Sequence, residues 1–174
     1  MKRSGLLTTK RLCVTAIFMA LNMLMSSFSI PVPPDGHFYL NDIIICVFAL
    51  LFDPLASFLV GGVGAFLGDF FFYPGHVQVM FVSLLAHGLQ AAAISLLSRH
   101  TFKKKPLYAD MLGVSVGAVI MVTGYMLGRA FVYSTPAYAL LKLPFELLQA
   151  GVGAVAGVLL CRKAGLKKLR DRLF

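Results

Sequence analysis

The 174-residue chain is 59% hydrophobic and only 13% charged, and its mean hydropathy is +0.84. This composition excludes an ordinary soluble domain, because water cannot solvate so much apolar surface, and it indicates a single-domain integral membrane protein. The net charge of +9 would suggest nucleic-acid binding in a soluble protein, but its distribution along the chain favours a membrane topology instead.

Six apolar stretches predict transmembrane helices. They span about residues 12–30, 40–52, 54–72, 78–98, 108–132 and 137–161, within one domain of residues 1–174. The stretch at 40–52 is short for a helix that needs roughly 20 residues to cross the hydrocarbon core. We therefore expect an all-α integral membrane protein built as a bundle of six helices.

The 16 Lys and Arg residues are distributed asymmetrically along the chain. All except Arg129 and Lys142 precede the first stretch, lie between the fourth and the fifth, or follow the sixth. Because cytoplasmic segments carry the excess of Lys and Arg, this pattern predicts that both termini are cytoplasmic in a multi-pass protein of the cell membrane. Nucleic acid is not expected as a partner.

Small residues recur at helical spacing in the apolar stretches. Ala16 and Ala20 form such a pair in the first, and glycine pairs mark the third, fifth and sixth. Small side chains let helix backbones approach closely in a membrane. For the glycine pairs this indicates packing within the bundle, whereas the alanine pair could equally receive a partner protein.

Polar side chains inside a membrane domain are costly, which makes them candidates for function. The proline-rich loop 31–39 is expected outside the membrane, with His37 facing solvent, and it leads to Asn41. Asp69 lies near the outer end of the third stretch, and the last three stretches each carry a polar stripe on one face. Together they predict a mostly apolar pocket for a small, polar, ring-shaped ligand. The candidate ligand-binding residues are Asn41, Asp69, Ser83, His87, Gln90, Tyr125, Arg129, Lys142, Glu146 and Gln149.

For any single candidate a plainer interpretation exists. Arg129 and Lys142 could extend to the outer membrane surface, with Asp69 and Glu146 as their counterions.

Several signatures of enzymes and self-powered pumps are absent from the sequence. It has no phosphate-binding GxxxxGK[ST] loop, no HExxH, no GxSxG, no metal-ligand spacing and no visible inverted repeat. We expect no cofactor and no metal, and we expect another subunit to supply the energy for any uphill transport. Two alternatives remain: an intramembrane enzyme using Asp69, His76 and His87, and a small scaffolding membrane protein.

The order of several short motifs resembles a known family. The resemblance rests on Ala16-Ile-Phe-Met-Ala20, Phe38-Tyr-Leu-Asn-Asp42, Leu51-Phe-Asp-Pro-Leu55, Gly68-Asp69, Tyr73-Pro74, His87-Gly-Leu-Gln90 and Glu146-Leu-Leu-Gln149-Ala-Gly-Val-Gly153. Across nearly the whole chain, this order is similar to the substrate-binding (S) component of energy-coupling factor (ECF) vitamin transporters. It is most similar to the branch for hydroxymethylpyrimidine, pyridoxine or riboflavin uptake.

The resemblance implies a prokaryotic plasma-membrane protein without its own ATPase. Its partners would be a transmembrane coupling (T) protein and two cytoplasmic ABC ATPases, with Ala16 and Ala20 as the docking face. Its vitamin pocket would lie in the outer parts of the last three helices, under the first and third external loops. Related sequences often have Asn where Glu146 stands, so a carboxylate here favours a ligand with a hydrogen-bond donor or a positive charge, or else an internal ion pair with Lys142 or Arg129.

Overall fold

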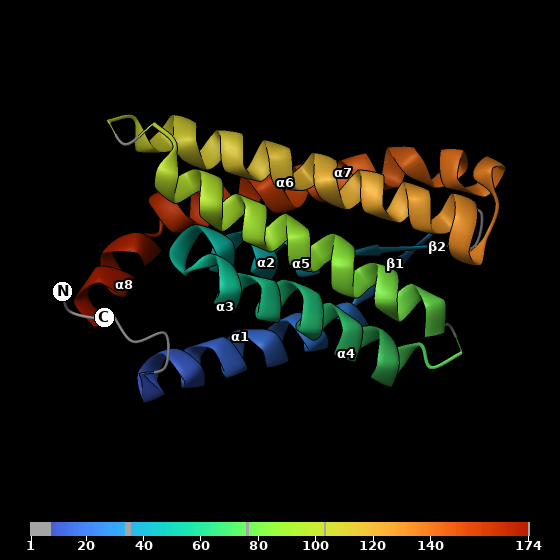
Figure 1. The fold of residues 1–174 in the computed structure, drawn as a ribbon, viewed down its shortest axis with the longest axis horizontal. Coiled ribbons are helices and arrows are strands. Elements are labelled where there is room, and N and C mark those ends of the chain that lie inside the picture. The colour runs from blue at the N-terminus through green and yellow to red at the C-terminus, as the bar shows by residue number, and fades with distance from the viewer. Residues whose placement is uncertain (1–7, 34–35, 76, 103, 174) are drawn as a thin grey trace.

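The computed structural model describes residues 8–33, 36–75, 77–102 and 104–173, most of which are helical (Figure 1). Outside the described residues lie Lys2, Arg3 and Lys103 of the basic segments, Pro34 and Asp35 of the proline-rich loop, and His76. The elements are α1 (Thr9–Ser27), β1 (Ser29–Val32), β2 (Gly36–Tyr39), α2 (Asn41–Leu51), α3 (Pro54–Phe58), the π-helical turn η1 (Leu59–Val63), α4 (Gly64–Phe72), α5 (Val77–His100), α6 (Pro106–Gly128), the π-helical turn η2 (Arg129–Tyr133), α7 (Pro136–Arg162) and α8 (Leu166–Leu173).

Four helical segments of the described chain are long and apolar enough to cross a membrane. They are Pro54–Phe72, Val77–His100, Pro106–Tyr133 and Pro136–Arg162, and they match the last four predicted spans. The 19-residue α1 is not among them, since Lys10, Arg11 and Asn22 lower its hydropathy. The helix count of six thus remains a prediction.

The first predicted span ends earlier than expected. Instead of reaching residue 30, the helix stops at Ser27, and Ser29–Val32 pairs antiparallel with Gly36–Tyr39 as a hairpin, with Ile30 opposite Phe38. Pro31 lacks the backbone N–H that a helix requires, but an edge strand tolerates it.

The short second span has a structural explanation. Helix α2 has only 11 residues and lies at the centre of the bundle, packed against α1, α5 and α7. All but two of its residues are buried, and Ile45 and Phe48 are completely inaccessible. A helix enclosed by protein need not match the bilayer thickness, so its length follows from the bundle.

Glycines allow the closest helix contacts. A Cβ atom on Gly153 or Gly157 of α7 would lie within 2.6 Å of a side-chain atom of Asp42 or Cys46 on α2. The glycine face of α7 therefore packs inside the bundle, as expected. Ala16 and Ala20 differ, since both are exposed on the outward side of α1.

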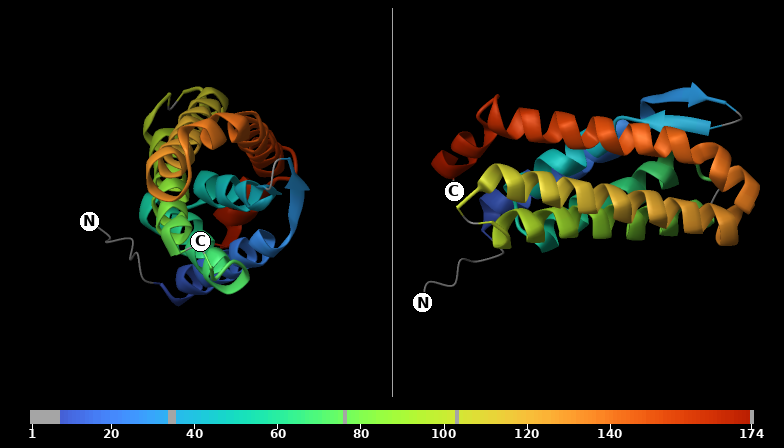
Figure 2. Two further views of the ribbon diagram at one scale, coloured as in Figure 1. Left: turned by 90° about the vertical axis from the view of Figure 1, so that its right-hand side faces the viewer. Right: turned by 90° about the horizontal axis from the view of Figure 1, so that it is seen from above.

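The bundle is elongated, and its two ends differ in character (Figures 1 and 2). The start of α1, the connection from α5 to α6, and α8 lie at one end, which carries most of the basic residues. The β1–β2 hairpin, the α4–α5 connection and the η2–α7 junction lie at the other end.

Proline marks the start of a helix at both ends of the bundle. At the start of α3, Pro54 follows Asp53, whose Oδ1 accepts a 3.0 Å hydrogen bond from the backbone N–H of Ala56. At the start of α7, Pro136 follows Thr135.

Candidate ligand-binding site

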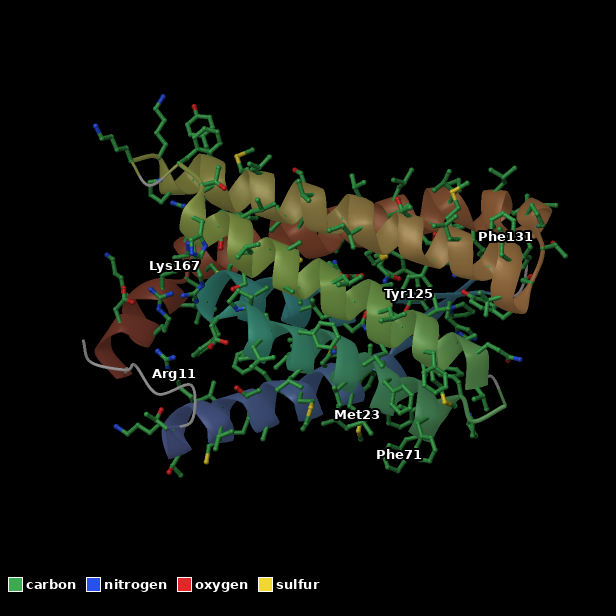
Figure 3. All side chains as sticks on the ribbon, viewed as in Figure 1. Arg11, Met23, Phe71, Tyr125, Phe131 and Lys167 are labelled. Atoms are coloured by element: carbon green, nitrogen blue, oxygen red, sulfur yellow. The ribbon has the colours of Figure 1, made fainter. Side chains whose placement is uncertain are left out.

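A cavity of about 410 Å³ lies at the hairpin end of the bundle, within the size range of small-molecule sites. Its walls come from the hairpin, α4, α5, α6, η2 and α7. Tyrosines dominate the lining, and in Figure 3 Tyr125 lies between the helices whereas Phe71 lies on the outer surface. The lining residues are His37, Tyr39, Asp69, Tyr73, Val79, Ser83, Met121, Tyr125, Arg129, Tyr133, Ser134, Tyr138, Lys142, Phe145, Glu146 and Gln149.

An ion pair between Arg129 and Glu146 forms one polar edge of the cavity. Arg129 opens the π-helical turn η2, and Glu146 lies nearly three turns into α7, so the pair joins the two helices. The Arg129 guanidinium also lies over the ring of Tyr125, 5.7 Å from its centroid. The second carboxylate oxygen of Glu146, Oε2, is buried and accepts no hydrogen bond within the described part of the chain. This edge therefore combines fixed donors with a free acceptor.

A second polar group joins three helices across the cavity. The Ser83 hydroxyl of α5 donates a 2.5 Å hydrogen bond to Asp69 Oδ2 of α4, and its oxygen lies 2.7 Å from the Tyr125 hydroxyl of α6. Because a serine hydroxyl has only one proton, the Tyr125 hydroxyl must be the donor to Ser83. The chain of hydrogen bonds fixes the Tyr125 ring against the cavity.

The hairpin is tied over the cavity by side chains from distant parts of the sequence. The Lys142 ammonium donates to the carbonyl oxygens of Val32 (3.2 Å) and Pro33 (3.3 Å), and it lies over the rings of Tyr138 and Phe145. On the other side, the Ser29 hydroxyl lies 2.9 Å from His37 Nδ1 and 3.0 Å from the Tyr73 hydroxyl.

Tyr39 of the hairpin is partly buried. Burial, with a smaller contribution from neighbouring Tyr73, raises the pKa of the Tyr39 hydroxyl well above its ordinary value. The phenol stays neutral and remains available as a hydrogen-bond donor.

Below the cavity, a buried carboxylate organises a hydrogen-bond network. Asp42 is 1% exposed, and its two oxygens accept hydrogen bonds from Gln90 Nε2 (2.7 Å) and Gln149 Nε2 (2.6 Å). Gln149 Oε1 accepts the backbone N–H of Tyr39 at 3.0 Å, and Gln90 Oε1 lies 2.8 Å from His87 Nδ1. The network connects the hairpin to α2, α5 and α7 and so fixes the floor of the cavity.

Most of the sequence-predicted candidates converge on the cavity. The lining includes Asp69, Ser83, Tyr125, Arg129, Lys142, Glu146 and Gln149. The other three candidates are buried but do not line it: His87 and Gln90 belong to the network beneath, and Asn41 begins α2, with its side-chain oxygen lacking a described partner.

Sequence reasoning missed the aromatic residues of the site other than Tyr125. Tyr133, Tyr138 and Phe145 line the cavity, and each lies three or four residues from Arg129 or Lys142. The helical periodicity used for the polar stripes would have found them. His37 is exposed, as expected, and it also borders the cavity. Among the described residues no group of three or more His, Cys, Asp or Glu side chains could hold a metal ion.

The fold and the cavity define a class: a helical membrane protein with one polar and aromatic cavity near one end. A family model described as "ECF-type riboflavin transporter, S component" matches residues 6–168. The chain therefore belongs to the family of ECF-type riboflavin transporter S components, and it is a membrane-spanning transport subunit rather than an enzyme.

Two further similarities accompany this match. A protein of Pyrococcus woesei described as "Uncharacterized protein in gap 3'region" is 30% identical over 129 residues, which are 74% of this chain and 82% of that protein. A solved structure described as "Structure and mechanism of the S component of a bacterial ECF transporter" matches with a TM-score of 0.72, covering 90% of this chain and 95% of that one. At 19% sequence identity, this likeness shows the S-component fold.

Proposed function

We propose that this chain is the substrate-binding subunit of an ECF-type importer in a prokaryotic plasma membrane. It captures an aromatic B vitamin or vitamin precursor from outside and delivers it inward together with a T protein and two ABC ATPases. In this proposal six helices cross or enter the bilayer, the basic end faces the cytoplasm, and the hairpin end faces outward.

The observation that carries the proposal is the combination of aromatic walls with the Arg129–Glu146 edge. Tyrosine and phenylalanine rings favour a flat ring through stacking and edge-to-face contacts. The guanidinium donates, and the free Oε2 of Glu146 accepts, so the edge complements a ring that presents a donor beside an acceptor. The imide edge of riboflavin and the amino-substituted edge of hydroxymethylpyrimidine both have this pattern, and pyridoxine offers hydroxyl groups to the same oxygen.

Among these ligands we favour riboflavin. The family takes its description from riboflavin. The aromatic side chains of the lining come from several helices, and they are spread more widely than a ligand with a single small ring would need. The hairpin would shield the bound vitamin, because Lys142 and Ser29 tie it down over the cavity.

A thermal-shift comparison tests the proposal. Detergent-purified protein is melted with riboflavin, hydroxymethylpyrimidine or pyridoxine. A ligand present at one hundred times its Kd stabilises the folded state by about 2.7 kcal/mol, and we expect riboflavin to raise the melting temperature most. If none of the three compounds shifts the melting temperature at millimolar concentration, the vitamin-capture proposal fails.

A single-site variant then tests the edge. Glu146→Gln keeps the shape of the side chain but removes its charge and presents a donor where the free acceptor was. We expect riboflavin affinity to fall roughly 5- to 150-fold, the effect of one lost hydrogen bond to a buried group. Leu147→Met is the matched control, since Leu147 is the adjacent residue of α7 and is 56% exposed on the outer surface.

A further inference from the structure

A second cavity, of about 310 Å³, lies at the opposite end of the bundle from the vitamin site. It forms where the start of α1, the end of α2, the end of α5 and the C-terminal α8 meet. Figure 3 shows Arg11 of α1 and Lys167 of α8 at this same end. The charged side chains in its lining are Arg11, Arg99 and Arg170, with Asp53 and Asp171.

Two of the arginines are fixed on one carbonyl oxygen. Arg99 Nη2 and Arg170 Nη1 each donate a 2.8 Å hydrogen bond to the backbone oxygen of Leu51, the last residue of α2. Arg99 also donates to the Ser95 hydroxyl at 3.2 Å. The end of a helix leaves carbonyl groups without helical partners, which accounts for this oxygen accepting both donors. A carbonyl carries only a partial charge, so two guanidinium groups are held together without a full counterion between them.

The carboxylates leave positive charge unbalanced. Asp171 is 64% exposed and pairs with Arg170 at 2.5 Å. Asp53 caps α3 by accepting the backbone N–H of Ala56. The side chain of Arg11 has neither an ion pair nor a hydrogen bond to any other described residue, although it lines the same cavity. Three cationic groups thus face two carboxylates, and one of the cations has free donors.

We propose that this cavity binds a phosphoryl anion, supplied either by the headgroup of an anionic phospholipid or by free phosphate. The planar guanidinium fork of arginine matches phosphoryl oxygens in bidentate geometry. The fork of Arg11 is free, and the positive charges of Arg99 and Arg170 lie in the lining of the same cavity. Asp53 and Asp171 suit a headgroup that also carries hydroxyl groups, because a carboxylate accepts hydrogen bonds from them.

The surroundings favour a headgroup as the source. Leu12 follows Arg11 directly and is 52% exposed, and Leu55, two residues after Asp53, is 59% exposed. Apolar side chains on the outer surface beside a cationic cavity suit acyl chains beneath a bound phosphate. Basic residues near a membrane surface also attract anionic lipid over neutral lipid.

Binding is measured on the full-length protein in a neutral detergent. The lipid probe is dioctanoylphosphatidylglycerol, and its control is dioctanoylglycerol, which has the same acyl chains but no phosphate. The probe for free phosphate is sodium phosphate, and its control is sodium chloride at equal ionic strength. We expect phosphatidylglycerol to bind at least tenfold more tightly than dioctanoylglycerol. Stabilisation by sodium phosphate as well would identify a site open to free phosphate, whereas stabilisation by phosphatidylglycerol alone would identify a lipid site; either supports the phosphoryl assignment. Equal binding of the two lipids would overturn it.

Arg11→Gln is the decisive variant, because the Arg11 side chain makes no hydrogen bond or ion pair with another described residue. We expect it to weaken phosphatidylglycerol binding roughly tenfold, the effect of losing a charge-assisted hydrogen bond. Lys10→Gln is the control: it removes a positive charge from the neighbouring residue, which does not line the cavity. Equal losses in both variants, or phosphatidylglycerol binding of Arg11→Gln within twofold of the parent, would contradict the proposal. Vitamin binding at the other end reports independently that each variant is folded.

Discussion

At the scale of single residues, the Arg129–Glu146 pair combines two roles. It supplies the polar edge of the cavity, and it joins η2 to α7. The side chains are 16% and 9% exposed, so both charges are largely removed from solvent. Removal of one partner from such a pair leaves the other charge buried and uncompensated, whereas removal of both does not.

This asymmetry gives a prediction for unfolding. We expect Glu146→Leu to destabilise the ligand-free protein by about 3–5 kcal/mol, and we expect the double variant Arg129→Leu with Glu146→Leu to recover a large part of that loss. The measurement is thermal or denaturant unfolding in detergent without ligand. Leu148→Ala, at an exposed position of the same helix, controls for a general weakening of α7. Additive losses from the two single substitutions would show that the pair contributes no coupling energy.

The sequence could specify some residues of the site and not others, for physical reasons. Ser83, Lys142 and Glu146 were predicted because helical spacing aligns each with other polar residues of its stripe. Asp42 was not, although its carboxylate organises the floor. Its role depends on Gln90 and Gln149, which lie 48 and 107 residues away in sequence. No local pattern encodes such a long-range arrangement.

At the scale of elements, the helices were more predictable than the hairpin. The apolar stretches at 54–72, 78–98, 108–132 and 137–161 correspond closely to helices because an apolar run of that length has few alternatives in a membrane. Residues 31–39 were expected to form a proline-rich loop, and residues 29 and 30 were expected to end the first helix. The strand pairing of residues 29–39 depends on contacts with α7 and Tyr73 that a single segment does not show.

Helix α1 presents the surface for a prediction about assembly. Ala16 and Ala20 lie on its exposed side, whereas Asn22 and Ser26 on the opposite side pack against η1 and α4. Close approach of a T protein requires small side chains at the contact. We expect Ala16→Trp or Ala20→Trp to abolish vitamin uptake and co-purification with the T protein, while vitamin binding to the isolated chain changes less than twofold.

The control for this prediction is Leu21→Trp. Leu21 belongs to the same helix and is 40% exposed, but it lies farther round the helix from the alanine pair. Leu21→Trp should retain uptake. If vitamin binding is lost together with uptake in the alanine variants, α1 supports the cavity through packing, and the docking assignment is wrong.

At the scale of the whole molecule, most of the positive charge and the cavity under the hairpin lie at opposite ends of the bundle. The described residues of the three basic segments lie at the end that holds the arginine cavity, and the proposed vitamin site lies under the hairpin at the other end (Figure 1). This polarity suits an importer that takes its ligand from outside and presents its basic end to the cytoplasm. The orientation itself is a prediction from the charge rule, and it can be tested directly.

Cysteine accessibility in whole cells tests that orientation. In a background carrying Cys13→Ser, Cys46→Ala and Cys161→Ala, we expect Ser134→Cys to react with a membrane-impermeant thiol reagent and Thr101→Cys to react only after the cells are opened. Ser134 is exposed at the hairpin end, and Thr101 lies in the basic connection from α5 to α6. Because Cys46 and Cys161 are buried, vitamin binding must first show that the background is folded. Since Ser134 lines the cavity, bound vitamin should also slow its labelling. Labelling of Thr101→Cys in intact cells, with Ser134→Cys protected, would show the opposite orientation. The proposed vitamin site would then face the cytoplasm, where it could not capture a ligand from outside.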